Sequence, residues 1–423
     1  MISKNAKRIT LLLSVVYFAS YLLRKNFSVM LSAITASGFD AVALGAVGSA
    51  LTVSYGAGQI INGFLGDKIK PQNLLGLGLI LASACNLAMA FCTTVPLMAA
   101  VWFVNGFAHA MLWPPIVKLL AIHMNDREYG YAVVRISVAS SIATIILYTI
   151  SPILLNVMKW SNVILLIAAT GVCITVIWFV SSPVVFSSDK DSASALSTEK
   201  VSEQGRAVPL PRSVLIPTAL IFIAIVLQGA LRDGVGDWMP TFMADTFNID
   251  PKNAIITGVV PCVFSIISFY AFDALHRRLL KNEVSCAGAI FTTATVSSAL
   301  LLIINLFAPS GIASGILSTV TITILVSCMH GINLMLITIV PKRYVRCGKV
   351  STVSGILNSA TYVGAAIALP LFPALKTNFS WGVTIAVWTV ICALGAAVCL
   401  LVAPAWRRFK NEYSDKGEEE SAK

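Results

Sequence analysis

The amino-acid sequence predicts an all-α membrane protein in which twelve transmembrane helices form two similar six-helix halves. Of its 423 residues, 57% are hydrophobic and only 12% are charged, and the mean hydropathy of +0.84 exceeds what a soluble domain can hide from water. Apolar stretches of about 20 residues recur along nearly the whole chain, and each can cross a hydrocarbon core of about 30 Å as a helix. The alternating pattern of a membrane barrel is absent, so helices are the expected spanning form.

The order of the apolar segments defines the expected domains. We place the helices at 10–34, 41–65, 72–93, 95–122, 130–155, 160–182, 214–243, 253–275, 284–307, 311–339, 350–372 and 380–403. The first segment lacks a small-residue cleavage site, so we expect a retained helix and not a signal peptide. The expected halves are 1–182 and 214–405, joined by a polar linker at 183–213 and followed by a polar tail at 406–423.

The positions of the basic residues predict the orientation of the chain. Its formal charge of +11 could indicate nucleic-acid binding, but the bases cluster in alternate loops at the ends of the expected helices. Both termini and the linker are therefore expected on the cytoplasmic side of a cell membrane. Nine cysteines are scattered without paired spacing, which predicts neither disulfides nor a metal site.

Two acids stand at equivalent loops of the two halves. Asp67 follows the second expected helix and precedes Lys68, and Asp273 stands at the end of the eighth and precedes a pair of arginines. An acid followed by bases at this position resembles the loop signature of the major facilitator superfamily, although the second copy lacks the preceding glycine. We expect a gating role for both acids, as a cytoplasmic latch between helices. The alternative is that each acid only caps a helix or neutralises nearby bases.

One arginine lies deep in the first helix of each half. Arg24 is about 21 Å into its segment and Arg232 about 22 Å into its own, at a depth where an ionisable residue needs a partner or a function. A planar guanidinium offers forked donors that match phosphate or carboxylate oxygens. Across a pseudo-two-fold axis, the pair would suit a dianion in a central cavity.

Each arginine also has a structural alternative. Arg24 could snorkel with Lys25 to the outer interface, and Arg232 could form a salt bridge with a neighbouring acid. Asp233 points about 100° away around the helix, so we expect it to be a poor partner. Asp237 could instead stabilise the outer end of the segment.

Three stretches resemble the organophosphate:phosphate antiporters, which include the bacterial glycerol-3-phosphate and hexose-phosphate transporters. They are residues 17–27, 113–115 and 231–241, and in the first of them Tyr17, Tyr21 and Arg24 fall on one helical stripe. The resemblance covers the whole twelve-helix plan, with a looser match at 355–362. It implies that Arg24 and Arg232 bind phosphate and that the pocket is lined by Tyr17, Tyr21, Trp113 and Tyr362.

This sequence departs from that family around the phosphate site. Gln59 stands where the glycerol-3-phosphate transporters carry a lysine, Ala139 where they carry a histidine, and Gly229 where they carry a tyrosine. The resemblance therefore implies a retained phosphate anchor with altered neighbours, including Gln59 in the pocket, so the head group need not be glycerol or a hexose.

Three further polar residues in expected helices have two readings each. Arg135 could reach into the cavity and replace a lost contact, or it could snorkel to the cytoplasm or pair with a gate acid. His109 and His330 occupy matching helices and could bind substrate or carry protons. A lone histidine in a bundle is more often a hydrogen-bonded packing residue.

These observations predict a secondary active transporter of a small organic phosphate or related anion that exchanges it for inorganic phosphate by alternating access. The alternatives are a proton-coupled transporter, with the histidines or Asp233 carrying protons, and a transporter-like sensor of a phosphorylated metabolite. No nucleophile constellation or phosphate-cradling loop is present, so we expect no enzyme. We also expect a monomer that contacts the lipid bilayer, without cofactor, metal or nucleic acid.

Overall fold

The computed structural model describes residues 2–187, 212–247, 257, 259–308, 311–345 and 347–413. Most of the expected linker and the end of the expected tail lie outside these ranges. The chain divides into two compact units: Met1–Val208 with Tyr344–Ser359, and Pro209–Arg343 with Ala360–Lys423. We call them unit 1 and unit 2.

All regular structure in the described residues is helical, and 12 helices there are long and apolar enough to cross a membrane. The prediction of an all-α chain with twelve spanning helices is confirmed. Unit 1 contains α1 (Lys4–Val29), α2 (Leu31–Ala36), α3 (Ala41–Lys68), α4 (Pro71–Met89), α5 (Val95–Ala110), α6 (Trp113–His123), α7 (Asp126–Leu155) and α8 (Trp160–Ser187).

Unit 2 contains the remaining helices and shares one of them with unit 1. Its elements are α11 (Arg212–Phe247), α13 (Val259–Arg278), α14 (Glu283–Phe307), α15 (Ile312–Ile332), η2 (Asn333–Ile339), η3 (Val340–Tyr344), α16 (Val350–Asn378) and α17 (Trp381–Tyr413). The first turns of α16, up to Ser359, belong to unit 1, and its later turns belong to unit 2.

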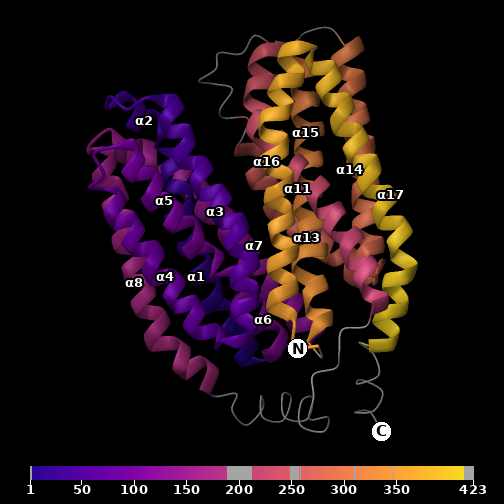
Figure 1. Ribbon diagram of the computed structural model, residues 1–423. Coiled ribbons are helices and arrows are strands. Elements are labelled where there is room, and N and C mark those ends of the chain that lie inside the picture. The colour runs from indigo at the N-terminus through magenta and orange to yellow at the C-terminus, as the bar shows by residue number, and fades with distance from the viewer. Residues whose placement is uncertain are drawn as a thin grey trace. The chain divides into compact units, whose positions relative to one another are not determined.

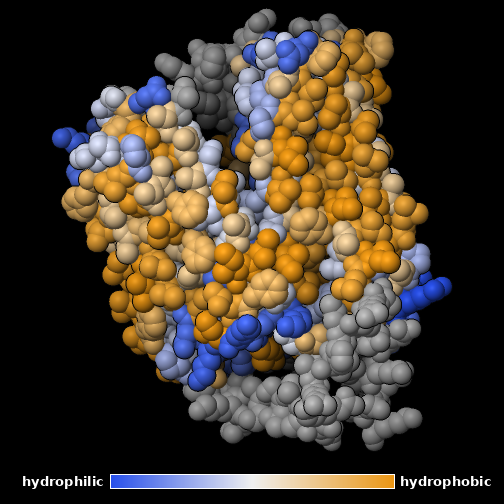
Figure 2. All heavy atoms as spheres, in the orientation of Figure 1, coloured by the Kyte–Doolittle hydropathy of each residue, from blue (hydrophilic) through white to orange (hydrophobic). Residues whose placement is uncertain are grey.

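Within each unit the helices pack side by side (Figure 1). In unit 1, α1 packs on α7 and α8, α3 packs on α5, and α4 packs on α5 and α8. In unit 2, α14 packs on α15 and α17, α11 packs on the same two helices, and α13 packs on α15. Hydrophobic side chains cover much of the visible surface between more hydrophilic ends (Figure 2), as lipid-facing helices require.

Local sequence explains where several helices begin. The side chains of Asp40, Asn125 and Asn282 each accept a hydrogen bond from the backbone N–H three residues later, at the starts of α3, α7 and α14. Pro71 begins α4, where the missing N–H of proline costs no helical hydrogen bond.

Two expected helices are interrupted at corresponding places. The expected helix at 95–122 is split into α5 and α6, because Pro114 and Pro115 lack the N–H groups needed to continue α5 and instead start α6. The expected helix at 311–339 changes from α-helix to the π-helix η2 after Ile332. His109 and His330 each lie in the last turn before the interruption.

Candidate functional site

Arg24 lies inside unit 1, and the structure does not place it at the lipid surface. It is 9% exposed, and its guanidinium carbon lies 4.5 Å from the ring centroid of Tyr21 and 4.8 Å from that of Tyr55. Cation–π contacts of this kind contribute about 0.5–2 kcal/mol each. Two rings therefore hold Arg24 within the unit, while Lys25 is exposed. This arrangement favours the binding interpretation over snorkelling.

An aromatic run connects Arg24 to the break in the fourth spanning segment. The ring centroids of Tyr17 and Tyr21 are 5.2 Å apart, and those of Tyr17 and Trp113 are 4.9 Å apart. Trp113 is the first residue of α6, so the interruption before the two prolines places its indole ring against α1. The structure thus brings together four of the candidate residues expected from the sequence.

Tyr55 also contacts Arg24, although the sequence analysis did not single it out. It is 3% exposed and belongs to α3, one helical turn before Gln59. The sequence did contain a signal, because Tyr55 is a tyrosine in a spanning helix and lies on the same face as the candidate Gln59. Its ring completes the aromatic environment of the Arg24 guanidinium.

Gln59 is fully buried in α3, and neither polar atom of its amide has a hydrogen-bond partner in the part of the chain that the structure describes. Leaving a buried amide unpaired costs about 1–3 kcal/mol. Such a group is satisfied by water or by a bound solute. Gln59 therefore holds unused hydrogen-bonding capacity inside unit 1, one helical turn from Tyr55.

Buried amides converge on the backbone of α1 beside Arg24. The carbonyl oxygen of Leu23 accepts hydrogen bonds from Nδ2 of Asn86 at 2.9 Å and from Nδ2 of Asn105 at 3.2 Å. Asn26 Nδ2 donates to Asn86 Oδ1 at 2.6 Å. All three asparagines are fully buried. They come from α1, α4 and α5, so this network fixes the position of α1 against its neighbours.

His109 extends the same network. Its Nε2 atom lies 3.0 Å from the carbonyl oxygen of Ser20, one turn before Arg24 in α1. A carbonyl oxygen can only accept, so Nε2 carries the hydrogen. His109 is 1% exposed. The arrangement fits a hydrogen-bonded packing residue behind the arginine better than a substrate ligand.

Arg232 in unit 2 has a partner that the sequence reasoning judged to be poor. Its Nε atom donates to Oδ1 of Asp233 at 2.7 Å, and its Nη2 atom donates to Oδ2 at 2.9 Å. The expectation that Asp233 points too far away is wrong, because the long arginine side chain bends around the helix to reach it. The Tyr362 ring centroid lies 6.0 Å from the Arg232 guanidinium carbon, at the limit of a cation–π contact.

Gly229 and His330 occupy packed positions in unit 2. A Cβ atom at Gly229 would collide with the backbone of Thr361 in α16. That contact leaves no room for the tyrosine found in the family. His330 packs edge-on against Phe269, with ring centroids 5.6 Å apart.

Arg135 does not join the other candidates of unit 1. Its guanidinium carbon lies 3.5 Å from the ring centroid of Tyr131, one turn nearer the start of α7. The Arg135 residue is exposed. Its side chain therefore turns toward the start of α7, away from Ala139.

The two loop acids differ in their surroundings. In unit 1, the Asp67 carboxylate accepts hydrogen bonds from the backbone N–H groups of Ser351 at 3.0 Å and Thr352 at 2.8 Å, and from the Thr352 hydroxyl at 2.6 Å. These groups lie at the start of α16, where a helix favours negative charge. Lys118 Nζ lies 3.8 Å from Asp67 and donates to the Gly66 carbonyl at 2.7 Å. These contacts support a latch.

Asp273, in contrast, is paired within its own helix. Arg277, one turn later in α13, donates to both of its carboxylate oxygens. This contact fits the alternative in which the acid neutralises a nearby base. Among the described residues, no group of three His, Cys, Asp or Glu side chains could hold a metal ion.

Comparison with known proteins identifies the family. A family model described as Major Facilitator Superfamily matches residues 13–346. The chain belongs to this family, and it is an integral membrane protein. Similarity to solved structures agrees on the fold: the proton:xylose symporter XylE, bound to 6-bromo-6-deoxy-D-glucose, has a TM-score of 0.74 at 11% identity and covers 94% of this chain and 95% of that chain. The outward conformation of FucP gives a TM-score of 0.68 at 13% identity, covering 93% and 98%.

Curated relatives confirm the resemblance found in the sequence. A glycerol-3-phosphate transporter of Bacillus subtilis is 24% identical over 86% of this chain and 85% of its own length. A probable hexose phosphate transport protein of Chlamydia trachomatis is 31% identical over 27% of this chain and 25% of its own length, so that match spans a quarter of the relative. The membrane sensor protein UhpC of Salmonella typhimurium is 22% identical over 55% and 56%.

Proposed function

We propose that this protein is a secondary active transporter of a small organic phosphate or related anion, with Arg24 and Arg232 binding the phosphoryl group. The observation that carries the proposal is that each unit holds one arginine well inside its first spanning helix and within cation–π distance of a tyrosine ring. Ring faces contact the flat sides of a guanidinium, and its N–H donors radiate in its plane, toward oxygens of an anion.

The named relatives support this substrate class. Two of them are named as transporters of glycerol-3-phosphate and of hexose phosphate. The buried Gln59 amide adds a neutral donor and acceptor in α3. We propose that Gln59 meets an uncharged polar group of the organic moiety, because a neutral amide adds no further attraction for an anion.

We propose that transport proceeds by exchange with inorganic phosphate through alternating access. When the transporter reorients with an empty site, the charge of Arg24 stays unpaired in a region without water, which is electrostatically costly. A bound anion offsets that charge. Asp233 already compensates Arg232 in part. The electrostatic penalty on empty reorientation therefore rests mainly on Arg24.

The experiment is uptake of labelled phosphate and phosphorylated metabolites by vesicles containing the purified protein. Vesicles preloaded with unlabelled phosphate are expected to accumulate label much faster than vesicles without internal anion. Equal rates in the two preparations would refute the exchange mechanism. Substrate binding without any flux would instead support a sensor, the role that the name of UhpC states.

Proton-coupled anion transport is a second candidate, favoured by the ion pair of Arg232 with Asp233. A phosphate that takes over the donors of Arg232 would leave the Asp233 carboxylate without its counter-ion, a situation that favours its protonation. Uptake would then respond to an imposed pH gradient. Loss of that response in Asp233→Asn, with phosphate exchange retained, would support this mechanism.

We also propose a location in a bacterial cytoplasmic membrane as a monomer, with both termini in the cytoplasm. The support is the distribution of bases in alternate loops and the contacts of Asp67, which we propose as a cytoplasmic latch. Labelling of a cysteine introduced at Lys4, in intact cells and in inverted vesicles, tests this orientation.

A further inference from the structure

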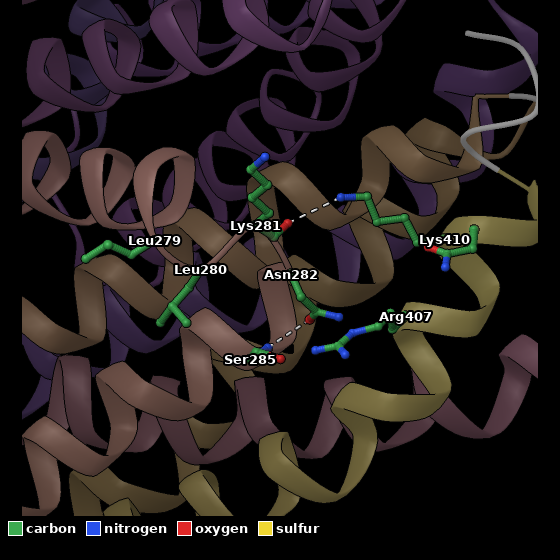
Figure 3. Close-up of a pocket in the computed structure, with 8 residues that line it drawn as sticks. Leu279, Leu280, Lys281, Asn282, Ser285, Arg407 and Lys410 are labelled. Carbon is green, nitrogen blue, oxygen red and sulfur yellow. Dashed lines mark hydrogen bonds between the residues drawn. The ribbon is translucent and has the colours of Figure 1, made fainter. Parts of the chain in front are cut away.

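Unit 2 contains a basic hollow at one end of its helices. A space of about 380 Å³ lies where the segment between α13 and α14 meets the last turns of α17 (Figure 3). The Asn282 amide links the two sides, because its Nδ2 atom donates to the Ala403 carbonyl at 3.3 Å and its Oδ1 atom accepts from the Ser285 N–H. Three cationic residues line the space: Lys281, Arg407 and Lys410.

Among the side chains that the structure describes, these cations are not balanced by acids around the hollow. Glu283 is the nearby carboxylate, fully buried, and Arg343 donates to its Oε1 atom at 2.9 and 2.6 Å. Lys410 lies farther away, 3.9 Å from the same oxygen. Because Arg343 offsets the charge of Glu283, the lining keeps a positive excess. In the part of the chain that the structure describes, neither Lys281 nor Arg407 lies within salt-bridge distance of a carboxylate.

An apolar surface leads from the spanning part of α17 to this hollow. Leu400 is 56% exposed and Leu401 is 79% exposed. Arg407 follows Leu400 by two helical turns, on the same face and about 10 Å farther along the axis. A ligand with an anionic head and apolar chains would match the basic hollow and the apolar surface beside it.

We propose that the hollow binds the phosphodiester head group of an anionic phospholipid, whose acyl chains lie along the exposed face of α17. Arg407 and Lys281 contact the phosphate, since arginine offers paired donors to its oxygens and lysine adds a point charge. Basic pockets between spanning helices are a recurring site for such head groups. The inference concerns residues outside the proposed transport site and does not depend on the transported substrate.

The test compares Lys281→Gln/Arg407→Gln with the matched control Lys7→Gln/Arg8→Gln, which removes the same charge from exposed residues of α1. The first variant leaves the contacts of Glu283 intact. Phosphatidylglycerol and phosphatidylcholine are titrated into each purified protein in detergent, and bound lipid is counted by native mass spectrometry. Two measurements check folding: the melting temperature in the absence of added lipid, and the rate of phosphate exchange.

We expect phosphatidylglycerol, and not phosphatidylcholine, to bind the wild-type protein and the control alike. Lys281→Gln/Arg407→Gln is expected to bind it about thirtyfold more weakly, at about 1 kcal/mol per basic residue. Equal weakening in both variants would overturn the proposal by showing attraction to net charge alone. A competition experiment adds inorganic phosphate or a second anionic lipid to the protein with bound phosphatidylglycerol. If phosphate displaces phosphatidylglycerol from the hollow as strongly as the second lipid does, the site binds free phosphate and the lipid proposal fails.

Discussion

The guanidinium of Arg232 and the carboxylate of Asp233, adjacent in the chain, form a two-pronged ion pair with donor–acceptor distances of 2.7 and 2.9 Å. Arg24 contacts tyrosine rings instead. The two arginines therefore differ in charge environment, although they occupy similar places in the sequence. An anion that binds Arg232 has to compete with a carboxylate that is already present.

Asp233→Asn removes this competition. The side chains of the pair are 17% and 29% exposed, so we assign it no more than about 1 kcal/mol. We expect phosphate affinity to rise about threefold, measured by calorimetric titration of the purified protein. Asp237→Asn, which removes the same charge one turn later from an exposed residue, is the control and should leave the affinity near its wild-type value. Unchanged or weaker binding by Asp233→Asn would show that Asp233 does not compete with substrate.

His109 variants separate positioning of α1 from direct contact with substrate. His109→Phe loses the donor to Ser20 and should lower both substrate affinity and stability, the latter by about 1 kcal/mol. His109→Gln keeps a donor and should restore most of both. The measurements are substrate affinity and the pH profile of exchange. If His109→Gln fails to recover affinity or changes the pH profile, then His109 binds substrate or carries a proton.

Asp67→Asn tests the proposed latch. The amide is nearly the same size but loses the charge that favours the start of α16 and strengthens its hydrogen bonds. We expect the maximal exchange rate to fall about tenfold, equivalent to about 1.4 kcal/mol, with little change in substrate affinity. Asp273→Asn serves as the matched comparison, since that acid pairs within its own helix, and it should stay within about twofold of wild type. A larger loss at Asp273 would reverse these assignments.

The sequence predicted the spanning helices well because their signal is local and repeated. Length and apolar composition set each segment, and the bilayer leaves few alternatives to a helix. The break before Pro114 was missed because an apolar run continues through it, although consecutive prolines are a helix-starting signal.

The contacts among the candidate residues were harder to predict than the helix faces on which they lie. Helical spacing placed Tyr17, Tyr21 and Arg24 on one stripe, and the structure shows two of the expected contacts among them. The direction of the Cα–Cβ bonds suggested that Asp233 was a poor partner for Arg232. The long, flexible side chain of Arg232 nevertheless reaches it. The convergence of Asn86 and Asn105 on Leu23 depends on tertiary packing between helices far apart in the sequence.

The most direct test of the central claim is phosphate affinity in Arg24→Lys, Arg232→Lys and Arg135→Lys at matched membrane abundance. Lysine keeps the charge but loses the planar fork. The account predicts at least a tenfold loss of affinity for each of the first two variants, and less than a twofold change for Arg135→Lys, whose side chain stacks on Tyr131. Near-normal affinity in both Arg24→Lys and Arg232→Lys, or a larger loss in Arg135→Lys than in either, would contradict the account.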